Sequence, residues 1–133
     1  MALPLRLPRF LGSRIVLPYA QASVSATATD YIYKLSYKFR VDAVKYVNHT
    51  GLAADATNYF VLTLQDGSNV IASWSTQTSA QGALTADTFV NFVMSGTDAY
   101  HVAAANDVLK LVLTLHGTQT LPAGLLQIEG HYV

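Results

Sequence analysis

The sequence predicts an all-β protein: an antiparallel β-sandwich of jelly-roll type with an extended N-terminal arm. Two observations support this prediction. Apolar and polar side chains alternate along several short segments, and a β-strand places alternate side chains on opposite faces. Turn signals rich in Gly, Asn and Asp separate seven or eight such segments, and no segment shows convincing helical periodicity.

Composition bounds the size and the surface of the protein. The 133 residues suffice for one domain with its own core. Charged residues make up 12% of the chain, against about 25% in an ordinary soluble domain, so partners are expected to cover part of an apolar surface. A net charge of zero argues against nucleic acid as a partner. The chain has no cysteine and no apolar stretch of about 18 residues, so neither a disulfide nor a membrane span is expected.

Residues 1–29 are expected to form the arm, and residues 30–133 the sandwich. Three prolines, at positions 4, 8 and 18, disfavour a continuous helix, yet the segment is richer in apolar residues than a disordered tail. Fully extended, it would span on the order of 95 Å. We expect it to lie on another protein; the alternative is an arm folded back onto its own domain, or an edge strand. The candidate contact residues are Leu5, Arg6, Arg9, Phe10, Arg14 and Ile15.

The sharpest alternation runs from Tyr31 to Val47 and predicts one long strand. Its phase slips near Asp42, where a β-bulge is expected. Aromatic side chains with a polar tip suit interfaces, although most such residues belong to cores. The three tyrosines expected on one face of this strand, Tyr31, Tyr33 and Tyr37, form a candidate interface for a homo-oligomer.

Further strands follow in order. Residues 59–65 and 70–74 predict a hairpin around the turn at 66–69. Residues 76–87 form a long polar connection, a length that is often functional. Residues 88–95 are assigned to a strand, although their apolar positions also fit a helix, and a short strand is expected over 99–103.

The last part of the chain predicts two more strands. Residues 108–116 carry four leucines at alternate positions, as expected for a central strand. A loop over 117–124 leads to a final strand at 125–133.

No arrangement of residues points to catalysis. The four histidines do not pair on one element as metal ligands would. Most aspartates fall in predicted turns, which their side chains cap, and nothing selects a carboxylate pair for a glycosidase. Neither a Gly-x-Ser-x-Gly elbow nor a phosphate-binding glycine loop is present. We therefore expect no enzyme, metal or cofactor. Asn48-His49-Thr50 matches a glycosylation sequon, a pattern that is common by chance.

Taken together, the chain resembles the small jelly-roll decoration, or cement, proteins of tailed bacteriophage capsids. The likeness covers nearly the whole chain. It includes the apolar N-terminal segment, the sandwich rich in Thr, Ser and Ala, a late strand entered through an Asn-Asp turn (AAANDVLKLVLTLHG) and a final strand after a Pro-Ala-Gly loop. The resemblance implies a structural protein on the virion exterior, without catalytic residues. It also implies a homotrimer whose arms staple neighbouring subunits of the major capsid protein.

Two other functions remain open. A carbohydrate- or receptor-binding module of a head or tail fibre would use exposed aromatic residues and the connection at 76–87. A small jelly-roll major capsid protein would need a basic arm for its genome, and three arginines match that poorly.

Overall fold

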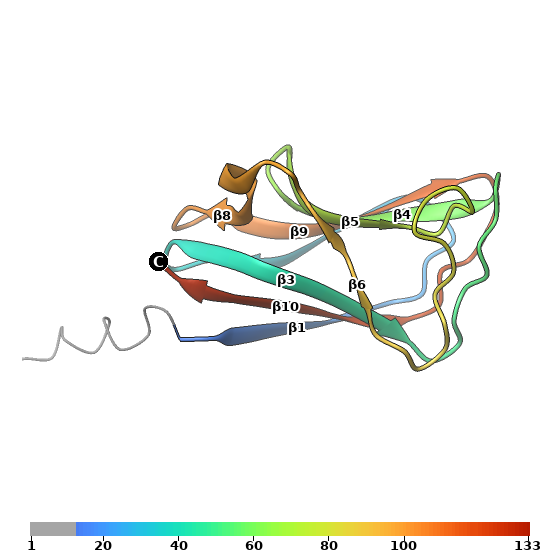
Figure 1. Ribbon diagram of the computed structural model, residues 1–133, viewed down its shortest axis with the longest axis horizontal. Coiled ribbons are helices and arrows are strands. Elements are labelled where there is room, and N and C mark those ends of the chain that lie inside the picture. The colour runs from blue at the N-terminus through green and yellow to red at the C-terminus, as the bar shows by residue number, and fades with distance from the viewer. Residues whose placement is uncertain (1–12) are drawn as a thin grey trace, which may run out of the picture.

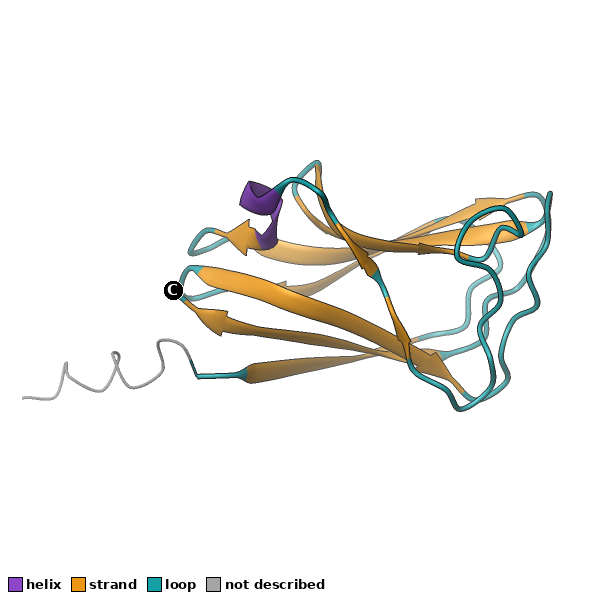
Figure 2. Ribbon diagram, viewed as in Figure 1, coloured by secondary structure: helices purple, strands orange, loops and turns teal. Residues whose placement is uncertain are grey.

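A computed structural model describes residues 13–133, which form two antiparallel sheets packed face to face (Figures 1 and 2). The β3 sheet contains β1 (Ile15–Gln21), β10 (Gly124–Tyr132), β3 (Phe39–Asn48) and β6 (Val90–Asn91) in this order, and β8 (Val102–Ala103) also pairs with β3. The β9 sheet contains β2 (Ala28–Lys34), β9 (Val108–His116), β4 (Tyr59–Asp66), β5 (Asn69–Ser75) and β7 (Val93–Met94) in this order. The predicted antiparallel sandwich is confirmed, and this strand order is that of a jelly roll when β6, β7 and β8 are taken as one interrupted strand.

The core lies between the two sheets. Apolar side chains at alternate positions of β4 and β9 point into it, and most of them are fully buried. Burying each such side chain contributes about 1.5–3 kcal/mol. The predicted inward faces of these strands and of β10 are confirmed; the fully buried members are Phe60, Leu62, Leu64, Leu109, Leu111, Leu113, Leu126 and Ile128.

The stretch from Tyr31 to Val47 is not one strand, contrary to the prediction. β2 ends at Lys34 in one sheet, and β3 begins at Phe39 in the other. Leu35 turns this corner: its N–H donates to the carbonyl of Asp107 (2.9 Å), and its carbonyl accepts from the N–H of Asn106 (2.7 Å). The alternation continues through the corner because both strands face the same core.

The predicted phase slip near Asp42 is confirmed as a β-bulge. Ala43 pairs with Glu129 and Val41 with Gly130, so Asp42 is the extra residue on β3. The bulge restores the inward direction of Val44 after Val41, and it leaves the side chain of Asp42 on the outer surface.

Residues 15–21, which were expected in an extended arm, form β1 at the edge of the β3 sheet. β1 runs antiparallel to β10, with Ile15 opposite Gly130. Pro18 is tolerated because an edge strand has backbone groups that need no partner. The edge-strand alternative therefore describes this segment, and the sandwich begins well before residue 30. Four of the candidate arm residues lie outside the described residues: Leu5, Arg6, Arg9 and Phe10.

The segment after the long polar connection crosses from one sheet to the other. β6 pairs with β3 and β7 pairs with β5, and Phe92 lies between them. Phe92 is buried, and its N–H donates to the carbonyl of Val44 (2.8 Å). The strand expected at 88–95 thus exists as two short pieces. The strand expected at 99–103 is reduced to β8, because Asp98–His101 form the 3-10 turn η2.

The two ends of the sandwich differ (Figure 1). The four long connections, at 22–27, 49–58, 76–89 and 117–123, gather at one end. The opposite end, here called the short-turn end, carries the turns at 35–38, 67–68 and 104–107, together with the start of β1 and the C-terminus.

Candidate interaction surfaces

The three tyrosines expected to share one face lie in three different places. Tyr31 is 73% exposed on the outer face of the β9 sheet. Tyr33 is half-buried, and its hydroxyl donates to the carbonyl of Pro18 on β1. Tyr37 lies in the corner between β2 and β3, edge-on to Tyr132 with ring centroids 5.6 Å apart. Of the three, only Tyr31 lies on the broad outer face of a sheet.

The side of the sandwich between β1 and β2 is closed by tyrosine hydroxyls. Tyr19 on β1 donates to Oδ2 of Asp30 on β2 (2.8 Å), and Tyr33 on β2 reaches Pro18 on β1. Burial raises the pKa of Tyr19 to about 12, and the hydrogen bond to Asp30 acts in the same direction. These two bonds join the edge strands of the two sheets through side chains.

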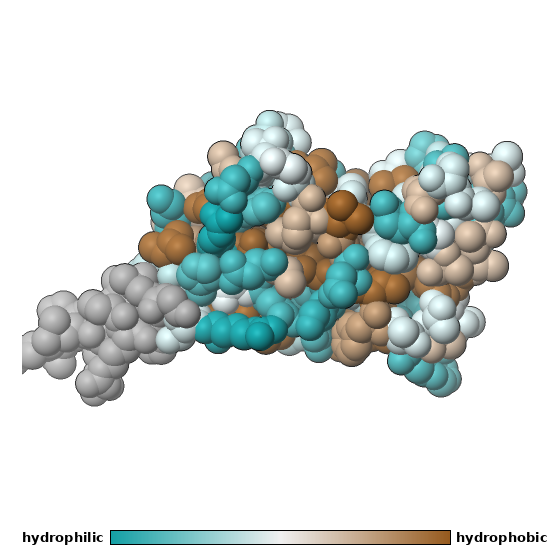
Figure 3. All heavy atoms as spheres, in the orientation of Figure 1, coloured by the Kyte–Doolittle hydropathy of each residue, from teal (hydrophilic) through white to brown (hydrophobic). Residues whose placement is uncertain are grey.

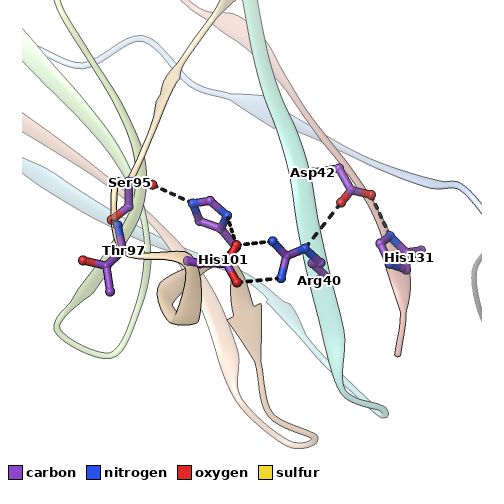
Figure 4. A network of polar contacts seen from close by, with 7 residues as sticks. Arg40, Asp42, Ser95, Thr97, His101 and His131 are labelled. Carbon is purple, nitrogen blue, oxygen red and sulfur yellow. Dashed lines mark hydrogen bonds and ion pairs between the residues drawn. The ribbon is translucent and has the colours of Figure 1, made fainter.

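A charged network covers the short-turn end (Figure 4). The Arg40 guanidinium binds Asp98 of η2 and lies 3.9 Å from Oδ1 of Asp42. Nδ1 of His131 lies 2.7 Å from Oδ2 of Asp42, and Nε2 of His101 lies 2.8 Å from the carbonyl of Ser95. The hydrogen bond from Arg40 lowers the pKa of Asp98 below its usual value. The network ties η2, β3 and β10 together, and its members satisfy one another.

A second charged cluster lies on the outer face of the β3 sheet. Glu129 of β10 is buried and accepts from Arg14 and from Nζ of Lys45, the latter at 3.0 Å. The hydrogen bond from Lys45 is the main cause that lowers the pKa of Glu129, and Arg14 adds to it. Arg14, a candidate arm residue, is thus held by its own sandwich just before β1. Ile15 likewise belongs to β1 and packs against the core.

Several sites that the sequence raised have a simple structural explanation. The side chain of Asn48 in the sequon points inward, since the residue is 3% exposed and its Oδ1 accepts from the N–H of Gly51 (2.6 Å). His116 stacks on Tyr59, with ring centroids 4.6 Å apart. Within residues 13–133, no group of three or more His, Cys, Asp or Glu residues could hold a metal ion. In the same range, no helix is long and apolar enough to cross a membrane.

Figure 3 shows hydrophilic residues gathered over β3 and β10 on the face in view. The ion pairs of β3 and β10 join residues far apart in the chain, such as Arg14 with Glu129 and Arg40 with Asp98. Sequence reasoning missed these pairs because no local spacing relates their members.

Comparison with known proteins identifies a fold but no family. No family model matches the chain, and neither does any curated protein. A chain in the cyanophage Pam1 capsid asymmetric unit superposes with a TM-score of 0.56 at 13% identity, covering 93% of this chain and 88% of that chain. A chain of infectious bursal disease virus, Gx strain, gives a TM-score of 0.39 at 12% identity, covering 90% of this chain and 32% of that chain. The second likeness is too low to bear on the fold, whereas the first shows that the two chains share it.

Proposed function

We propose that this chain is a structural virion protein that decorates and stabilises a viral capsid. The observation that carries the proposal is the jelly roll shared, over nearly its full length, with a chain of a cyanophage capsid. The low charge of the sequence also fits a protein whose surface is covered by neighbouring subunits. The ion pairs of Arg40 with Asp98 and of Lys45 with Glu129 join neighbouring elements of the sandwich, which fits a structural role.

The proposed partners are the major capsid protein and further copies of this chain, as a homotrimer. Residues 1–12 would supply the staple, because they are rich in apolar side chains and precede β1 at the short-turn end. Leu5, Arg6, Arg9 and Phe10 are then the capsid contacts. Arg14 and Ile15 anchor the root of the staple, since the sandwich already engages both. Several staples on one oligomer would bind together through their effective concentration.

The test removes residues 1–12 only, because a deletion to residue 29 would also remove β1 and leave β10 as an edge strand, paired with β3 alone. The shortened and full-length proteins are mixed with particles of the source virus that have been stripped of this chain. We expect an unchanged melting temperature and oligomer mass, together with loss of binding to the particles. Undiminished binding would show that residues 1–12 are not the staple. Failure of the full-length protein to bind would remove the decoration role itself.

The glycan-binding alternative has its own readout in the same experiment. Binding of the shortened protein to a glycan array would favour a receptor-binding module, because the sandwich alone would then carry the activity.

A further inference from the structure

The outer faces of the two sheets differ in charge. On the β3 sheet, the outer-face rows of Ala43, Lys45 and Val47 carry two charges, on Lys45 and Glu129, and the short-turn end adds Arg40, Asp42 and His131. Over its three middle rows of paired residues, the outer face of the β9 sheet carries a single charge, on Lys110, and Lys34 stands in the next row, opposite Val108. A strand face in contact with water usually alternates in polarity with the buried face, so a nearly uncharged outer face is informative.

The rows of this face follow from the strand register. The central row crosses all five strands, and cross-strand pairs of this kind are the unit of sheet stabilisation. It consists of Thr29, Val112, Thr63, Ser73 and Val93. One flanking row consists of Tyr31, Lys110, Gln65 and Val70, and the other of Thr114, Val61 and Ser75. We call these three rows the Thr63 face.

The side chains of the Thr63 face suit burial against another protein. Val and Thr are stiff at χ1, and Ser is short, so ordering them costs little conformational entropy. Lys110 is the only charge that would have to be desolvated or to reach the rim. The two exposed large hydrophobic members, Tyr31 at 73% and Val93 at 52%, stand on the two edge strands of the sheet. Aromatic side chains such as Tyr31 are enriched at protein interfaces.

The size of the face can be compared with what an interface needs. Twelve positions, on strands about 4.8 Å apart and in rows about 7 Å apart, cover roughly 400 Å². Two such faces in contact bury roughly 800 Å², which is the size of a weak, transient interface. An association of this size is expected to be weak, with a Kd on the order of micromolar.

We propose that the Thr63 face is an interface between copies of this chain. A second copy matches it in charge, because an uncharged face meets an uncharged face. With a two-fold axis along the central row, Lys110 of one copy lies over the Thr114 row of the other, and no two like charges meet. This two-fold contact is separate from the three-fold contacts of the proposed homotrimer. The biological role of this contact rests on the proposed function, whereas self-association of the purified chain does not depend on any capsid.

The test compares one substitution on the two sheets. Val112→Lys places a charge in the central row of the Thr63 face, and Val47→Lys places the same charge on the outer face of the β3 sheet. Both residues are half-buried, on internal strands. Sedimentation velocity of the full-length proteins from 1 to 100 µM, taken as roughly spanning the expected Kd, gives the mass, and circular dichroism confirms folding. If Val112→Lys fails to fold, Ser73→Lys in the same row replaces it.

We expect the unmodified chain and Val47→Lys to associate, and Val112→Lys to weaken association roughly tenfold or more. A single-chain mass for the unmodified protein over the whole range would overturn the proposal and leave the face to a different partner. Undiminished association of Val112→Lys, or equal losses in both variants, would also overturn it. Binding to stripped particles is measured separately, so either proposal can fail without the other.

Discussion

Gly130 of β10 packs tightly against β3, and replacing it with alanine should destabilise the protein. A methyl group there would press against the carbonyl oxygen of Arg40 and lie 2.6 Å from Cζ of Phe39. Neither neighbour can swing away, because the first belongs to the backbone of β3 and the second is fully buried. The chain must therefore distort the Asp42 bulge to accept Gly130→Ala.

Overpacking of this kind costs about 1–3 kcal/mol, and a clash with backbone favours the upper part of that range, about 2–3 kcal/mol. The entropy of unfolding is about 2.1 cal/mol/K per residue, or about 0.28 kcal/mol/K for 133 residues, so the melting temperature should fall by roughly 7–11 °C. Thermal unfolding followed by circular dichroism measures this shift.

Gly96→Ala is the matched control, because a Cβ at Gly96 meets no heavy atom within 4 Å and the backbone there is not left-handed. Its melting temperature should stay within about 2 °C of the unmodified protein, as for most surface substitutions. Melting temperatures of the two variants that agree within that margin would refute the claimed lack of space at Gly130.

Two further predictions concern stability. Phe92→Ala should cost about 3–5 kcal/mol, because Phe92 is buried where the chain crosses between the sheets, whereas Phe89→Ala should cost under about 0.5 kcal/mol because Phe89 is 46% exposed. Urea unfolding compares the two variants. Equal losses of unfolding free energy would contradict the burial of Phe92 between the sheets. Burial, reinforced by Asp107, raises the pKa of Asp66 from 3.8 to about 6. The folded state then binds this proton more tightly than the unfolded state, so the stabilising effect is complete below about pH 4 and is lost as the pH rises through 6. The unfolding free energy of Asp66→Asn should therefore not fall between about pH 4 and pH 6 for this reason. Parallel curves of unfolding free energy against pH for the two proteins would show that Asp66 does not cause the fall.

The local sequence pattern predicted those strands whose bounds depend on neighbouring residues alone. The bounds of β9 follow from its alternating leucines and from the turn before it, where Asn106 has a φ of +73°. The corner at Leu35 could not be found in this way, because it has no Gly, Pro or Asn and the alternation passes through it unchanged. A single strand and two strands in facing sheets give the same pattern when both face one core.

The prediction that Tyr31, Tyr33 and Tyr37 share one face was wrong for a related reason. Tyr31 pairs with Lys110 and Tyr33 with Leu109, so Ile32 is an extra residue in β2 and the two tyrosines no longer share a face. No signal in the local sequence predicts this bulge. The Thr63 face could not be predicted either, since its central row joins five strands whose register only the folded chain defines.

The crossing at Phe92 makes the two long sides of the sandwich mechanically unequal. On that side the chain crosses from one sheet to the other between two paired segments, β6 and β7, with only Phe92 between them. On the opposite side, the covalent link between β1 and β2 is the connection at 22–27 at one end, and along their length the two strands are joined by the tyrosine hydroxyls of Tyr19 and Tyr33. A force that pulls the two sheets apart should therefore separate them first along the side of β1 and β2. Because β1 directly follows residues 1–12 in the chain, tension on that segment would act on this side first.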